Sequence, residues 1–253
     1  MNWIGLWTLI RREVGRFFSV YRQTVLPGLI SSTLYILVFG FTLQRRIAEI
    51  DGVGYTIFIL PGLIMMNTLT NASANTSSSM LQMKLLQQLP DLLTAPLSSL
   101  EISLAYIIGG TVRGTVNGIL VLLLGLALVG LPVHHPLLTV VLIMLVSWCF
   151  AAMGLLLGQL ADTWDQLAML QNFFLTPLSF LGGIFYSIKM LPEWAQTVSR
   201  GNPIYYMINA IRYTTIGIYD SPPLFSFVMA LLMTIGFTMA ALLLMRSGRK
   251  IKQ

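Results

Sequence analysis

The sequence predicts an all-α integral membrane protein that forms one domain over residues 1–253. Hydrophobic residues make up 56% of the chain and charged residues 9%, whereas an ordinary soluble domain has about 45–50% and 25%. Long apolar runs recur, and about 20 apolar residues are enough for a helix to cross a bilayer. The length allows about six such spans and leaves no room for a separate soluble catalytic domain.

The net charge of +6 would suggest a nucleic-acid partner in a soluble protein. Here most Lys and Arg residues flank apolar runs, where anionic membrane lipid and the inside-positive rule account for them. We therefore expect contact with lipid and no nucleic-acid site. The lone Cys149 cannot form an internal disulfide. His134 and His135 are neighbours in one loop, a poor geometry for joint metal ligation, so no metal site is expected.

The first element is predicted to be an interfacial helix over residues 2–22. Apolar residues including Trp3 and Trp7 recur on one helical face, and the opposite face carries Arg11, Arg12, Glu13 and Arg16. A first span follows at about residues 25–43, with Pro27 in its first turn. Because arginines precede this span, the N-terminus is predicted to be cytoplasmic.

Further spans are predicted at about residues 55–78, 102–129, 137–160, 167–186 and 224–245. Before the last span, a capping Asn202-Pro203 pair starts a periodic segment that is too short to cross the membrane. We expect this segment to lie at the outer face or to re-enter the bundle. The basic tail RSGRKIKQ, which includes Arg249 and Lys252, and the excess of Lys and Arg on the inner side place the C-terminus in the cytoplasm.

The second span is polar in its latter half, where Asn67, Asn71 and Asn75 share one helical face. An amide in hydrocarbon must find a partner or water. This stripe either packs against other helices or lines a polar pathway, and the sequence leaves both open. The fifth predicted span also has a polar side, and its polar and aromatic residues include Asn172, Phe173, Thr176, Ser179 and Phe180.

The third span carries Gly110, Gly114 and Gly118 at a spacing that lets two membrane helices approach closely. Arg113 lies among them. A charge at this depth must face the bundle interior, a polar cavity or a partner, which makes Arg113 a functional candidate. The alternative is a structural arginine paired with backbone carbonyls or with Asn117, one turn away.

Residues 80–101 form the only long break between apolar runs on the predicted inner side. The first part is amphipathic, and Pro90 and Pro96 mark turns. Such a segment suits a short helix that receives a push from outside the bilayer, and the alternative is a solvated loop. Its apolar positions are Leu81, Leu85, Leu89 and Leu92, and its polar positions include Lys84, Gln88 and Asp91.

No catalytic residue is predicted, so the chain is not expected to be an enzyme. No lysine follows a glycine, as a phosphate-binding loop requires, and there is no HExxH sequence. An ion-coupled carrier usually places carboxylates in mid-membrane, whereas the acidic residues here fall near predicted helix ends or loops. A carrier and a membrane assembly scaffold remain the alternatives to an ATP-driven permease.

Four motifs in order resemble the permease subunit of ABC-2 type transporters, in particular the YadH-type branch, which is similar to drug, nodulation-factor and polysaccharide exporters. They are PGLIMM (61–66), DLLTAPLS (91–98), TPLSFLGGIFYSIKMLP (176–192) and NPIYYMINAIRY (202–213). The resemblance covers essentially the whole chain. It implies a six-helix export permease in the bacterial inner membrane, paired with a second copy of itself.

The resemblance also implies two copies of a separate ABC ATP-binding subunit, which would hold ATP and Mg²⁺, while this chain needs no cofactor. The N-terminal helix and the segment between spans two and three would contact that subunit, and spans two and five would border the export path. The residues thereby assigned to the coupling contact are Arg11, Arg12, Leu81, Lys84, Leu85, Gln88, Leu89, Asp91 and Leu92. Those assigned to the path are Asn67, Asn71, Asn75, Asn172, Phe173, Thr176, Ser179 and Phe180. The substrate is left open.

Overall fold

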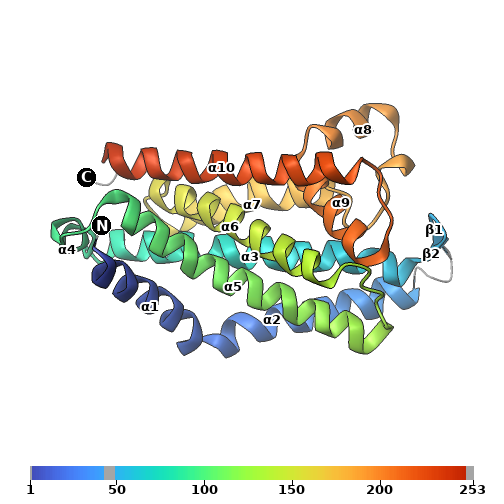
Figure 1. The fold of residues 1–253 in the computed structure, drawn as a ribbon, viewed down its shortest axis with the longest axis horizontal. Helices are drawn as coiled ribbons and strands as arrows, with labels where there is room; N and C mark the ends of the chain where they lie inside the picture. Colours follow the sequence, from blue (N-terminus) through green and yellow to red (C-terminus); the bar gives the residue numbers. More distant parts are fainter. Residues whose placement is uncertain (1, 43–48, 249–253) are drawn as a thin grey trace.

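The computed structural model describes residues 2–42 and 49–248, which form a bundle of long helices (Figure 1). Within this part, five helical segments are long and apolar enough to cross a membrane. The predicted all-α membrane fold is therefore confirmed. These segments are Tyr21–Gly40, α3 (Tyr55–Leu85), α5 (Ser99–Val129), α6 (Pro136–Leu160) and α10 (Pro223–Ser247).

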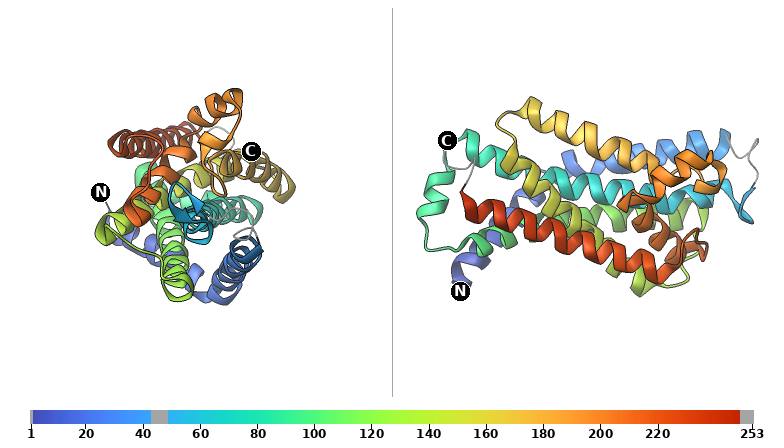
Figure 2. Two further views of the ribbon diagram at one scale, coloured as in Figure 1. Left: turned by 90° about the vertical axis from the view of Figure 1, so that its right-hand side faces the viewer. Right: turned by 90° about the horizontal axis from the view of Figure 1, so that it is seen from above.

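The predicted count of six spans is not confirmed. The fifth predicted span corresponds to α7 (Trp164–Leu181), which has 18 residues but is not among the five apolar segments because polar residues interrupt it. The helix begins where Thr163 accepts a hydrogen bond from the Gln166 N–H. It ends before Gly182 and Gly183, earlier than the predicted residue 186. Seen from above, α7 runs along one edge of the bundle (Figure 2).

The short elements gather at the two ends of the bundle (Figures 1 and 2). One end, here called the terminal end, holds the start of α1 (Trp3–Ser19), the short helix α4 (Leu89–Thr94) and the last turn of α10. The opposite end is called the hairpin end. It holds β1 (Glu49–Ile50), β2 (Val53–Gly54), η2 (Ile188–Met190), α8 (Glu193–Arg200) and α9 (Pro203–Ile216).

The boundary between the interfacial helix and the first span lies earlier than predicted. The chain bends at Val20, and the span consists of α2 (Tyr21–Tyr35) and the π-helical η1 (Ile36–Phe41). Pro27 therefore lies in the second turn of α2, not in the first. Residues 43–48, which include Arg45 and Arg46 between the first two predicted spans, and the tail beyond residue 248 fall outside the described residues.

The second span also extends beyond its prediction. Helix α3 continues past Ser78 to Leu85, and the chain then turns at Gln87, where φ is +54°. The polar run does not end the helix because its hydroxyls bond to their own backbone: Thr76 donates to the carbonyl of Ala72 at 2.9 Å. The predicted amphipathic helix is thus split between the last turn of α3 and the six-residue α4.

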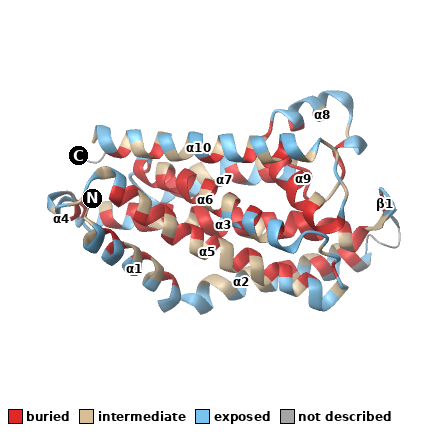
Figure 3. Cartoon of the chain, in the orientation of Figure 1, coloured by how far each residue is buried: buried red, intermediate tan, exposed pale blue. Residues whose placement is uncertain are grey.

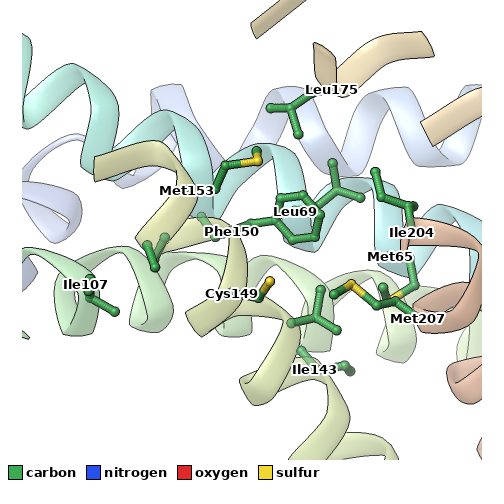
Figure 4. Close-up of a cluster of buried hydrophobic side chains, with 14 of the residues drawn as sticks. Met65, Leu69, Ile107, Ile143, Cys149, Phe150, Met153, Leu175, Ile204 and Met207 are labelled. Atoms are coloured by element: carbon green, nitrogen blue, oxygen red, sulfur yellow. The ribbon is translucent and has the colours of Figure 1, made fainter. Parts of the chain in front are cut away.

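Glycines let α5 and α6 pack closely on α3. A Cβ at Gly114 would lie 2.7 Å from the Ala72 Cβ, and one at Gly154 would lie 2.7 Å from the Ser73 Cα. Real side chains do not tolerate such distances, so these positions need glycine. An apolar cluster fills the space between the three helices (Figure 4). It includes the buried free thiol of Cys149.

At the hairpin end, α9 enters the bundle instead of lying on its surface. Asn202 caps it by accepting from the Ile204 N–H at 3.0 Å, and Gly217 ends it with φ of +76°. Most of α9 is buried, whereas α8 is largely exposed (Figure 3). Arg212, which lies in this segment, is also buried, and it donates to the carbonyl of Gly183 at 2.8 Å.

Asp220 joins the charges of the hairpin end. Its carboxylate lies 3.0 Å from the Lys189 ammonium and 3.8 Å from the Arg212 guanidinium. The hydrogen bond from Lys189 to Asp220 raises the pKa of that lysine above its ordinary value, and Asp51 adds to the effect. This cluster ties the loop after α7 to the loop after α9.

Candidate functional site

One face of α3 stays open while the rest of the helix is buried. Met66, Thr70, Ala74 and Ser78 are spaced four residues apart, and each is only partly buried or is exposed. All other α3 residues from Tyr55 to Met83, except Ile57, Asn67 and Gln82, are buried. We call these four residues the open face. It runs between α2 on one side and α7 on the other.

A polar groove of about 290 Å³ lies between α2, α3 and α5. On the α2 side, small and polar residues on one helical face line the groove over about three turns of the helix. Gly28 allows α2 to approach, since a Cβ there would lie 2.6 Å from the Asn67 Oδ1. The groove is lined by Gln23, Thr24, Pro27, Gly28, Ser31, Tyr35, Met66, Asn67, Thr70, Asn71 and Arg113.

A smaller hollow of about 90 Å³ lies on the other side of the open face, between α3 and α7. It shares Met66 and Thr70 with the polar groove, so the two spaces meet at the open face. Gln171 fixes α7 beside α3 by donating to the Ser77 hydroxyl at 2.7 Å. The α7 side of the hollow is lined by Gln171, Asn172, Leu175, Thr176, Ser179 and Phe180.

The residues predicted for the path on α7 fall into three groups. Asn172, Thr176 and Phe180 are exposed and line the hollow. Ser179 also lines it but is buried, and its hydroxyl donates to the Leu175 carbonyl of its own helix at 2.6 Å. Phe173 is 75% exposed and does not line the hollow. The predicted polar side of α7 is thus present, without Phe173.

The predicted amide stripe of α3 makes a ladder of hydrogen bonds. Asn67 donates to the Ser32 hydroxyl at 2.7 Å, and Asn71 donates to the Asn67 carbonyl at 3.1 Å. Asn75 accepts from Arg16 at 3.2 Å and is buried away from both spaces. Within this stripe, Asn67 and Asn71 line the polar groove, and Asn75 is buried outside it. A pathway role for the stripe stays a prediction.

Arg113 reaches from α5 to this ladder. Its Nε and Nη2 donate to the Asn71 Oδ1 at 3.3 and 3.2 Å. Asn117 does not pair with the guanidinium; its side chain donates to the Arg113 backbone carbonyl at 2.9 Å. Within the described residues, no carboxylate forms an ion pair with Arg113. The arginine thus carries a charge into the groove that only a neutral amide contacts.

The predicted polar face of the interfacial helix is wrong for Glu13, which is 1% exposed. Its carboxylate accepts from the Ser79 hydroxyl at 2.7 Å and from Arg12 at 2.8 Å, and Arg16 lies 3.7 Å away. Gly109 of α5 makes room for it, since a Cβ there would lie 2.6 Å from the Glu13 Cβ. The helix therefore turns Glu13 inward and leaves Trp3 and Trp7 exposed.

The residues predicted for the coupling contact are also divided. Leu81, Leu89 and Leu92 are buried against the chain itself. Lys84 donates to the Ala161 carbonyl at 2.7 Å and to the Asp162 carboxylate at 2.9 Å, so it joins α3 to the end of α6. The residues that remain accessible at the terminal end are Arg11, Arg12, Leu85, Gln88 and Asp91.

Glu101 lies where the start of α1, the segment after α4 and the start of α5 meet at the terminal end. It accepts from the Ser98 N–H at 2.7 Å, which caps α5, and also from the Asn2 N–H at the start of α1. The Asn2 side chain in turn donates to the Pro96 carbonyl of the segment after α4 at 3.4 Å. The segment after α4 is therefore hydrogen-bonded to the start of α1, and Glu101 joins the start of α1 to the start of α5.

Four aromatic rings join α2 to α7 near the hairpin end. The Phe185 ring lies 5.7 Å from Tyr35, 5.3 Å from Phe39 and 5.8 Å from Phe180, measured between centroids. Tyr35 lines the polar groove and Phe180 the hollow, so these rings bound both spaces at that end. Within the described ranges, no cluster of three or more His, Cys, Asp or Glu residues could hold a metal ion.

Sequence reasoning missed Thr70, Ser31 and Glu13 as site residues. Thr70 and Ser31 carry a signal, because each begins or continues a small and polar helical stripe: Thr70 with Ala74 and Ser78, and Ser31 with Thr24 and Gly28. Glu13 is flanked by two arginines, which indicates pairing. Nothing in the sequence indicates that the Glu13 side chain points into the bundle.

Comparison with known proteins gives consistent results across the chain. A family model described as ABC-2 type transporter matches residues 5–216. The chain is 37% identical over 252 residues to the inner membrane transport permease YadH of Escherichia coli (strain K12), covering 100% of this chain and 98% of that protein. It is 26% identical over 227 residues to nodulation protein J of Rhizobium leguminosarum bv. viciae, covering 86% and 83%.

Proposed function

Because the chain belongs to the ABC-2 type transporter family and is an inner-membrane permease by that membership, we propose that it forms the export path of an ATP-driven transporter. In this proposal it pairs with a second copy of itself. The energy comes from a separate ATP-binding subunit, two copies of which bind the pair. The terminal end of the bundle is cytoplasmic, so both chain termini lie inside the cell.

The open face of α3 is the observation that carries this proposal. A membrane helix with a polar, partly exposed face requires a partner or water there. Thr70 stands between two polar spaces, and Thr176 lies exposed across the hollow. A second copy related by a two-fold axis would place two such faces opposite each other. The enclosed space would be walled by α2, α3 and α7 of both copies.

Contacts at the terminal end support a partner that acts from the cytoplasm. Leu85 is 45% exposed and Leu86 56% exposed at the end of α3, next to the accessible Gln88 and Asp91. Two adjacent exposed leucines where the long helix α3 ends suit a groove on another protein. The links from Glu101 to Asn2 and Ser98 then carry the movement of this region into α1 and α5.

The accessibility of Thr176→Cys tests the proposal without a known substrate. In a Cys149→Ala background, the full-length chain and its ATP-binding partner are reconstituted in vesicles, and an impermeant thiol reagent is applied from either side. We expect the labelling rate to change at least threefold when ATP and Mg²⁺ are added and trapped with vanadate. Thr8→Cys, exposed on α1 away from both spaces, serves as the control and should not change.

The same measurement distinguishes an ion-coupled carrier. A proton or sodium gradient should leave the labelling rate of Thr176→Cys unchanged in the absence of ATP. A response to a gradient combined with no response to ATP would contradict the ATP-driven role and support the carrier.

A further inference from the structure

We propose that the polar groove binds a phosphate-class anionic group, carried on a membrane amphiphile or free, with Arg113 as its principal contact. This inference rests on the proposed function only in taking the groove as part of the path.

Positive charge exceeds negative charge along this side of α3. Arg12 and Arg16 lie beside the carboxylate of Glu13, whereas Arg113 bonds to the neutral amide of Asn71. Glu13 is already shared between Arg12 and Arg16. Arg113 is beyond this pairing, one turn further along α3, because it bonds to Asn71 while Arg16 bonds to Asn75. The groove therefore presents an uncompensated cation.

Donors are available on that cation. Arg113 uses Nε and Nη2 on Asn71, and its Nη1 has no hydrogen-bond partner in the described part of the chain. A planar guanidinium with a free N–H group matches the oxygens of phosphate or carboxylate. This donor on Arg113 favours a ligand with acceptor oxygens.

The groove has the dimensions and the position for such a ligand. Its volume of about 290 Å³ lies just below the range for drug-sized ligand sites, about 300 to 1,000 Å³, which suits a headgroup smaller than such a ligand. Gln23 and Thr24 lie in the first turn of α2, so the groove begins where the first span begins. A headgroup at that membrane level can enter the groove while its chains stay in lipid. Arg113 lies further in, near the middle of α5.

Quenching of a fluorophore in the groove tests the inference. A bimane is attached to Ser31→Cys in a Cys149→Ala background, and the full-length chain is placed in phosphatidylcholine nanodiscs. Spin-labelled phosphatidic acid is then titrated, with spin-labelled phosphatidylcholine as the neutral comparison. We expect half-maximal quenching at a mole fraction at least tenfold lower for phosphatidic acid. Equal quenching by the two lipids would overturn the proposal.

Two variants assign the site to Arg113. Arg113→Gln keeps an amide that can bond to Asn71 but removes the charge, and it should raise the mole fraction for half-quenching at least tenfold. Arg22→Gln removes an exposed arginine that bonds to the neighbouring Tyr21 and does not line the groove; it should change this mole fraction less than twofold. If Arg113→Gln binds as the parent does, the proposal is wrong.

Thr70→Trp provides a second variant that leaves the arginine unchanged. Thr70 is exposed and bonds only to its own helix, so a larger side chain there narrows the groove without disturbing the interior. The mole fraction of phosphatidic acid for half-maximal quenching should rise at least fivefold. An unchanged mole fraction would contradict binding in the groove. This measurement also applies if Arg113→Gln fails to fold.

Inorganic phosphate distinguishes the two sources of the anion. Displacement of the spin-labelled lipid by phosphate identifies a free anion as sufficient, whereas persistence of quenching identifies a membrane amphiphile as the ligand. Neither ATP nor the partner subunit takes part in these measurements. Failure of anion binding would therefore leave the ATP-driven role standing, and failure of that role would leave anion binding intact.

Discussion

Arg113 and Asn71 face each other across the contact between α5 and α3, and the Nε and Nη2 of the arginine donate to one amide oxygen at 3.3 and 3.2 Å. This pair does two things at once. It joins two membrane helices, and it holds a positive charge at the wall of a polar groove. A charge near the middle of a membrane helix costs about 2.5–3.5 kcal/mol on insertion scales, so its position indicates a role in the groove.

The pair should show coupled effects on stability. Asn71→Leu removes the one side chain in the described ranges that bonds to the guanidinium, and it should lower the free energy of unfolding by about 1–2 kcal/mol. Arg113→Met in the same chain removes the charge, so the double variant should recover part of the loss, with a coupling energy of about 1 kcal/mol. Thermal unfolding in detergent measures this cycle. Strictly additive losses would show that the two side chains do not interact.

The terminal end offers a matched pair of leucines. Leu85 is 45% exposed and Leu89 is 2% exposed. Leu85→Asp should therefore weaken co-purification of the ATP-binding subunit at least tenfold while leaving unfolding unchanged. Leu89→Asp buries a carboxylate and should destabilise the chain by about 3 kcal/mol or more.

Leu224→Asp is the control for these two variants, because Leu224 is 76% exposed at the hairpin end. It should affect neither property. Normal co-purification after Leu85→Asp would exclude the end of α3 from the partner contact.

Glycine positions should differ sharply in what they tolerate. Gly154→Ala places a Cβ 2.7 Å from the Ser73 Cα, and overpacking of this kind should cost about 1–3 kcal/mol. Gly236→Ala on α10 meets nothing within 4 Å and should be neutral or stabilise by up to about 1 kcal/mol through helix propensity. Unfolding midpoints of the two variants make the comparison. Similar midpoints would mean that α6 does not pack as closely on α3 as described.

Labelling from the two sides of the membrane tests the orientation. Gln87 is exposed in the turn between α3 and α4, and Glu193 is exposed at the start of α8. In a Cys149→Ala background, Gln87→Cys should react with an impermeant maleimide only from the cytoplasm, and Glu193→Cys only from the opposite side. The reverse pattern would place the chain termini outside the cell.

The sequence predicts the long helices well because burial in lipid requires long apolar runs. It also predicts the polar stripes of α3 and α7, since helical periodicity places Asn67 and Asn71 on one face without any knowledge of the partner. Both features are determined by the sequence of a single helix, without reference to its neighbours.

The remaining features depend on contacts between elements. The extension of α3 past Ser78 was missed because the amphipathic residues from Met80 onward were expected to form a separate short helix. The hydroxyls of the preceding polar run bond to their own helix, which therefore continues. The burial of the Glu13 side chain was missed because an amphipathic pattern does not show which polar residue will pack against a neighbouring helix. The space for Glu13 exists because Gly109, far along the chain in α5, has no side chain.

ATP hydrolysis tests the central claim, that this chain is a permease powered by another subunit, most directly. The purified full-length chain should hydrolyse no ATP above background, because it contains no phosphate-binding loop. Its complex with the ATP-binding subunit should hydrolyse ATP, and Leu85→Asp should abolish the contribution of the permease to the rate. Hydrolysis by the chain alone, after complete removal of partner proteins, would contradict the account, as would a complex whose rate is indifferent to the permease.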